Sequence, residues 1–120
     1  MEYAMVLPVL LLLILGVMEF AMVLFSYETL ANAAREGARA GIVPYAEPGQ
    51  RQTAAVSAAI SRAEPLKLTG ENVQFTWDSV AKTVRVEIFY DVRLMSAAII
   101  RAVGGNPVIS LHTSSVMRSE

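Results

Sequence analysis

The chain has 120 residues, of which 54% are hydrophobic and 18% charged, and its formal net charge is −1. Ten basic against eleven acidic side chains exclude the basic surface with which nucleic-acid-binding proteins neutralise phosphates, so no nucleic-acid partner is expected. The sequence contains no cysteine, which excludes disulfides, a thiolate nucleophile and a cysteine-bound metal.

The hydrophobic residues are concentrated at the start of the chain. The stretch from Tyr3 to Phe25 contains one charged residue, Glu19. As a helix it would be about 34 Å long, close to the ~30 Å hydrocarbon thickness of a bilayer. A cleaved secretory signal fits less well, because no basic region precedes the apolar run and the run exceeds the usual length of roughly 7–15 residues. We therefore expect residues 1–26 to form a retained membrane-spanning helix.

The helical pattern continues past this apolar run. A stripe at helical spacing, built mainly from alanine, consists of Tyr27, Leu30, Ala31, Ala34, Ala38 and Ile42. Pro44 ends the pattern, because the residue before a proline is disfavoured in a helix. We expect one helix over about residues 1–43, whose second half packs on the rest of the chain. The residues expected in this helix-to-head packing are Ala31, Ala34, Ala38, Ile42 and Trp77.

Residues 27–120 are predicted to form one small α+β head, made of the second half of this helix and the segments that follow. Helical spacing over 50–63 predicts a second, short helix that Pro65 ends. Alternation of apolar and polar residues over 73–78 and 84–92 predicts an antiparallel hairpin, and 108–117 supplies a third strand. The apolar segment 94–103 is either a short helix or a loop.

Three strands are stable on their own only when one face of the sheet is covered. We expect the alanine stripe of the long helix to cover this face. Its expected partners in the sheet are Phe75, Trp77, Val86 and Ile88.

Two acidic residues of the first helix have more than one interpretation. Glu2 is either an acid favoured by the helix dipole in the first turn or a counter-charge for the N-terminal amine of a neighbouring subunit. An ionised carboxylate facing lipid is costly. Glu19 is therefore protonated, faces a protein neighbour, or lies at the membrane interface if the span ends near Met18.

Two further positions weaken the helix locally. Pro8 removes one backbone hydrogen bond, and Gly16 lowers helix propensity. Both are tolerated in ordinary membrane helices, or they mark a segment that stretches when the helix moves from the bilayer into a protein bundle. The residues expected at contacts between such helices are Leu10, Leu11, Leu12, Leu13 and Ile14.

The polar residues offer no active site. His112 is the one histidine, with no second imidazole and no carboxylate pair at a fixed spacing near it. The serines lack a GxSxG context, and no glycine-rich phosphate loop is present. We expect no catalytic residue, cofactor, metal or small-molecule substrate. Arg35, Glu36 and Arg39 either form ion pairs along the helix or bridge to another subunit.

Three segments resemble a known family. They are MEYAMVLPVLLLLILGVMEF at the start, NAAREGARAG from Asn32 to Gly41, and SLHTSSVMRSE at the end. Together they are similar to the TadE-like proteins of tight-adherence (Flp-type) pili, within the wider type IV pilin-like superfamily. The resemblance covers residues 1 to about 43 and about 83 to 120, and the segment between them matches in size and character only.

The resemblance implies a structural subunit that polymerises through its hydrophobic helix into an extracellular filament at the cell surface. Residues 1–26 would then form the filament core, with Glu2, Pro8, Gly16 and Glu19 as assembly residues. The implied partners are copies of the chain in a helical filament, the cytoplasmic membrane before assembly, the pilus assembly machinery and a prepilin peptidase. The alternative is a single-pass membrane protein with an extracytoplasmic binding head.

The start of the chain departs from the family pattern. The family acid is the fifth residue of the mature protein, whereas Glu2 is second and no basic leader precedes it. The sequence is then trimmed, its start is misassigned, or its processing differs. The first basic residue as written, Arg35, would place the head in the cytoplasm by the positive-inside rule. A basic leader reverses this orientation, and the resemblance places the head outside.

Overall fold

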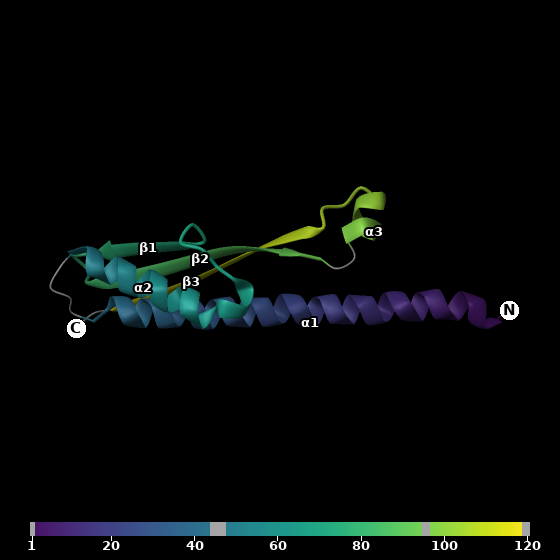
Figure 1. Cartoon of the computed structure of the whole chain (residues 1–120), viewed down its shortest axis with the longest axis horizontal. Coiled ribbons are helices and arrows are strands. Elements are labelled where there is room, and N and C mark those ends of the chain that lie inside the picture. Colours follow the sequence, from purple (N-terminus) through teal and green to yellow (C-terminus); the bar gives the residue numbers. More distant parts are fainter. Residues whose placement is uncertain (1, 44–47, 95–96, 119–120) are drawn as a thin grey trace.

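The structure is a computed structural model that describes residues 2–43, 48–94 and 97–118. Its main feature is one unbroken helix, α1 (Glu2–Gly41), along which a small head is packed at the C-terminal half (Figure 1). The molecule measures 72 × 22 × 22 Å. The sequence prediction of one helix over about 1–43 is confirmed. Pro44, which was expected to end it, lies outside the described residues.

The head contains the elements that were expected, in the expected order. α2 (Pro48–Arg62) is followed by a short 3-10 helix (Glu64–Leu66), β1 (Val73–Asp78), β2 (Thr83–Arg93), α3 (Ala97–Ala102) and β3 (Val108–Arg118). The three strands form an antiparallel sheet in the order β1-β2-β3. The α+β fold is therefore confirmed.

The structure differs from the sequence prediction, or decides between its alternatives, at two prolines and in the apolar segment after β2. α2 begins at Pro48 rather than at residue 50, since a proline is tolerated in the first turn of a helix, where its missing N–H has no helical partner. Pro65 lies inside the 3-10 turn, in a region expected to be a plain helix end and loop. Of the two alternatives for 94–103, the helical one is found over Ala97–Ala102.

The face of α1 that the head buries overlaps the predicted stripe in part, since Leu30, Ala34 and Ala38 are buried as expected. Tyr27 is exposed and Ala31 is half-buried, although both were assigned to the stripe. The missed positions are small or polar residues that a search for hydrophobic spacing passes over. The residues of α1 that are buried are Ser26, Leu30, Ala33, Ala34, Gly37, Ala38 and Gly41.

Small residues let α1 and α2 approach closely. A Cβ added to Gly37 would lie 3.0 Å from the carbonyl oxygen of Ala55 and 3.2 Å from the Cβ of Ala59. Gly37 and Gly41 are one turn apart on α1, as Ala55 and Ala59 are on α2, so one ridge of small residues faces another. The two helix backbones are therefore close enough for dispersion contacts, which stabilise the core.

The sheet packs against the same part of α1 and against α2. A Cβ on Gly41 would lie 2.9 Å from the ring of Phe75 and 3.0 Å from Val84. Val84, Val86 and Ile88 alternate along β2 and are fully buried, as expected for the covered face of a sheet.

Trp77 is half-buried at the edge of this core. The guanidinium of Arg51 in α2 lies 4.1 Å from the centre of its ring. Arg51 also donates a hydrogen bond of 2.9 Å to the carbonyl oxygen of Gly41 at the end of α1. One arginine thus links α2 to both the sheet and the long helix.

We expect Gly37→Val to destabilise the head by about 1–3 kcal/mol, because the added side chain must displace α2. The measurement is urea unfolding of the full chain in detergent, followed by the fluorescence of Trp77, the one tryptophan in the sequence. Gly16→Val is the matched control, since a Cβ there meets no heavy atom within 4 Å. Equal midpoints for the two variants would contradict the close helix contact.

Candidate assembly surface

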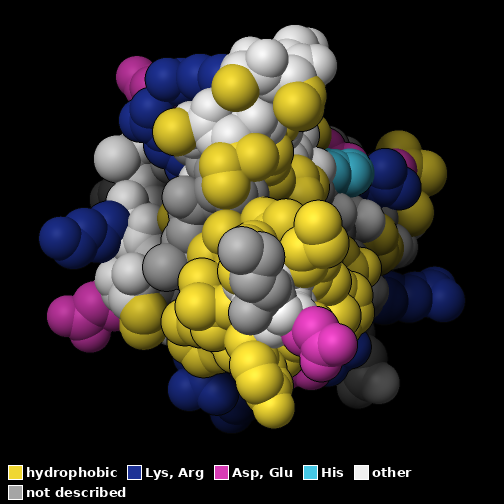
Figure 2. Space-filling model, turned by 90° about the vertical axis from the view of Figure 1, so that its right-hand side faces the viewer, with side chains coloured by type: hydrophobic (Ala, Val, Ile, Leu, Met, Phe, Trp, Pro, Cys, Tyr) yellow, Lys and Arg dark blue, Asp and Glu magenta, His cyan; other side chains and the backbone are white. Residues whose placement is uncertain are grey.

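The N-terminal half of α1 exposes hydrophobic side chains on all sides. In the apolar window of this helix no residue is buried inside the structure, and by length and composition the helix is able to cross a membrane. Figure 2, with this end of the helix facing the viewer, shows hydrophobic side chains gathered around it. Residues 10–14, the predicted helix–helix contacts, are exposed by 47 to 64%.

A continuous apolar surface of this extent does not remain in water. A helix that is apolar all round needs either acyl chains or other apolar helices around it. The same surface suits both environments, because lipid tails and leucine side chains are similarly apolar. It is the candidate assembly surface of this protein, and we define it as residues 3–25.

Glu2 lies in the first turn of α1 and its side chain is exposed. An acid at this position interacts favourably with the helix dipole, by about 0.3–1 kcal/mol. Met1 lies outside the described residues, so the structure does not bear on the pairing of Glu2 with an amine.

Pro8 does not interrupt α1, which is regular from Glu2 to Gly41. Because proline has no N–H, the carbonyl of Ala4 receives no helical hydrogen bond from it. Gly16 lies on an open surface, where an added Cβ would meet no heavy atom within 4 Å. Pro8 and Gly16 therefore both lie in the apolar surface and do not belong to the part of α1 that packs on the head.

Glu19 has a different position from the other assembly candidates. Within residues 2–25 the half-buried side chains are Leu15, Glu19 and Val23, four residues apart, and this row continues into the buried Ser26 and Leu30. The row therefore faces the side of α1 along which β2 and β3 extend (Figure 1). Sequence spacing alone could not show this, because the reach of the β2–β3 hairpin along α1 depends on how the sheet is placed.

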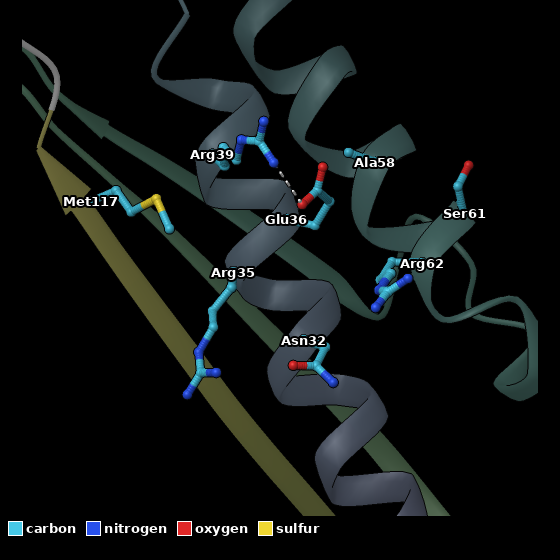
Figure 3. A pocket seen from close by; sticks show the side chains of 8 residues that line it. All are labelled: Asn32, Arg35, Glu36, Arg39, Ala58, Ser61, Arg62 and Met117. Atoms are coloured by element: carbon cyan, nitrogen blue, oxygen red, sulfur yellow. Dashed lines mark ion pairs between the residues drawn. The ribbon is translucent and has the colours of Figure 1, made fainter.

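A polar groove of about 630 Å³ lies between the C-terminal half of α1 and α2. Three arginines and one glutamate line it, and Figure 3 shows Arg35 pointing away from α2 while Arg62 of α2 points toward α1. Arg39 and Glu36 form an ion pair of 3.7 Å with exposed side chains, as one of the two sequence interpretations expected. Such a pair contributes about 0.2–0.5 kcal/mol.

His112 lies on the uncovered face of the sheet. Its ring stacks on Phe89 with centroids 4.5 Å apart, and its Nε2 atom is 3.9 Å from a carboxylate oxygen of Glu87. Within the described part of the chain, no group of three or more histidine, aspartate or glutamate side chains could hold a metal ion. The cross-strand stacking accounts for this histidine structurally.

The structure thus combines an exposed apolar helix half, able to cross a membrane by length and composition, with a small α+β head. The family of TadE-like proteins matches residues 1–39, which confirms the resemblance over the first segment, whereas the resemblance over residues 83–120 stays a prediction. The matched segment contains the whole candidate assembly surface and all buried residues of α1 except Gly41. The match covers 39 of the 120 residues. No curated protein and no solved structure matches the chain.

We expect Leu12→Asp to remove the chain from the membrane. A charge at the centre of a spanning helix costs about 2.5–3.5 kcal/mol. The measurement is the fraction of protein that stays with membranes after alkaline carbonate extraction. Val80→Asp, at a site that is 93% exposed in the β1–β2 turn, is the matched control and should extract like the unchanged chain. Equal retention of both variants would count against a membrane-embedded α1.

Proposed function

We propose that this protein is a structural subunit of a Tad-like extracellular filament, with no catalytic role, and that it polymerises through α1 and contributes to surface attachment. The observation that carries the proposal is that the TadE-like match coincides with an apolar helix half that is exposed around nearly its whole circumference. Before assembly the subunit is held in the cytoplasmic membrane. Its partners are copies of itself, the pilus assembly machinery and a prepilin peptidase.

Polymerisation solves a solvation problem for α1. A helix that leaves the bilayer needs a new environment that is equally apolar, and parallel copies of residues 3–25 provide it. Contacts between different faces of identical subunits do not close into a ring when each copy is staggered along an axis. Such contacts produce an open helical array, with the heads on the outside.

Glu2 is the polar element of this proposed core. In a bundle of apolar helices, an unpaired charge is expensive, and a neighbour's N-terminal amine is a suitable partner for a carboxylate. The exposed position of Glu2 in the first turn of α1 leaves its side chain accessible to a neighbouring copy. The pair would set the axial stagger between subunits, because it forms at one register only.

We expect Glu2→Ala to leave the membrane-inserted monomer intact and to abolish filaments. The measurement is negative-stain microscopy of sheared surface fractions, with the amount of subunit in the membrane determined in parallel. Glu28→Ala is the matched control, since Glu28 is an exposed acid of the same helix beyond the apolar surface. Normal filaments from the Glu2 variant would refute the pairing.

The same fractionation separates the filament subunit from the other candidate, a single-pass membrane protein with a binding head. A filament subunit appears in the sheared material, whereas a single-pass protein stays with the membrane. Mass spectrometry of the sheared subunit reports its N-terminus and hence the processing site.

A further inference from the structure

The hairpin of β2 and β3 extends beyond the rest of the sheet. β1 ends its pairing with β2 at Ile88, but pairing between β2 and β3 continues to Arg93 opposite Val108. Residues 89–93 and 108–112 thus form a two-stranded arm, and residues 97–106, which include α3, form its tip. Figure 1 shows the arm running along α1 toward the N-terminal half, with α3 at its end.

The level of the tip along α1 follows from two contacts. Val84 lies beside Gly41, and Val86 lies beside Gly37, so β2 runs antiparallel to α1. The nine residue-to-residue steps from Val84 to Arg93 span about 30 Å, which equals the length of roughly 20 residues of helix. The end of β2 is therefore level with about residue 21 of α1. The tip continues beyond it, beside the apolar surface 3–25.

The tip has the side chains of a membrane-interface segment. Ile99 is 51% exposed and Val103 is 79% exposed, and Val108 and Ile109 at the base of the tip are exposed as well. Figure 2 shows a further group of hydrophobic side chains above those of α1, on the side where the tip lies in Figure 1. The two charged residues between positions 92 and 109 are Arg93 and Arg101, both exposed, and no acid occurs there.

The arm has no third strand, and a two-stranded hairpin is marginal in water unless it packs on another element. The arm packs inward through the buried Val92 and through Tyr90 and Leu111, which contact the core. The backbone N–H of Leu94 donates to the carbonyl of Pro107 at 2.9 Å, and that of Gly105 donates to the carbonyl of Ile100 at 2.8 Å, which closes the tip. An apolar environment around the tip would strengthen these bonds and bury its exposed side chains.

We propose that the tip enters the lipid leaflet on the head's side when α1 spans the bilayer. Ile99 and Val103 then contact acyl chains, and the guanidinium groups of Arg93 and Arg101 contact lipid phosphates. The proposal rests on the membrane anchoring in the proposed function. It gives the subunit two points of attachment, which fix the depth and the rotation of the head before assembly.

The half-buried Glu19 agrees with this depth. It lies near the level of α1 at which β2 ends. Glu19 of α1 and the arginines of the arm would thus lie at a similar depth in the membrane. A second copy of the chain is the other candidate occupant of the tip, and the experiment below separates it from lipid.

The test uses the full chain in phosphatidylcholine–phosphatidylglycerol vesicles that carry a spin label on their acyl chains. Since the sequence has no cysteine, Val103→Cys accepts a single fluorescent label. We expect acyl-chain quenching of a label at position 103 to approach that of Val17→Cys in the apolar surface. Val80→Cys, at the far end of the sheet, is the matched exposed control and should show none.

Each outcome decides between the alternatives. Quenching at position 17 but not at 103 overturns insertion of the tip and leaves membrane anchoring intact, whereas no quenching at either site overturns both. Protection of position 103 that grows with protein density, without lipid quenching, assigns the tip to a second copy and overturns the proposal. With the label at 103, Ile99→Asp should reduce quenching, whereas Val80→Asp should not, and position 17 should be unaffected by either.

Discussion

The close contact of α1 with α2 is the constraint on which the head depends. Gly37 approaches Ala55 and Ala59 so closely that a single added carbon has no free space. Because α1 and α2 are in close contact, the buried side chains of β2 pack against both helices. The position of the sheet, and hence the direction of the arm, is set by this ridge of small residues. The head has no independent orientation relative to α1.

One helix therefore contributes both to the core of the head and to the exposed apolar surface. Residues 26–41 bury one face against the head, while residues 3–25 remain exposed around nearly their whole circumference. The border between these parts is gradual, because the row of Leu15, Glu19 and Val23 is half-buried beside the arm. The apolar surface and the residues that pack on the head thus lie on adjacent turns of the same helix.

Much of this fold could be predicted from local sequence. Apolar length predicts α1, and alternation predicts the strands, since both depend on neighbouring residues only. The rotation of α1 against the head could not be predicted, because glycine and serine give no hydrophobic signal although they allow the closest contact. The position of Arg51 over Trp77, and the level of the arm, depend on how separate elements meet. For the candidate site, the apolar residues 10–14 were evident, whereas the place of Glu19 beside the arm was not.

The continuity of α1 also has a mechanical consequence. Tension applied along the helix is carried by its backbone hydrogen bonds, and the head, attached sideways over about four turns, is a passive load. One of these backbone hydrogen bonds is missing at Pro8, far from the part of α1 that packs on the head. Elongation under force would begin there, so the rod could lengthen at its apolar end while the sheet and its contacts keep their shape.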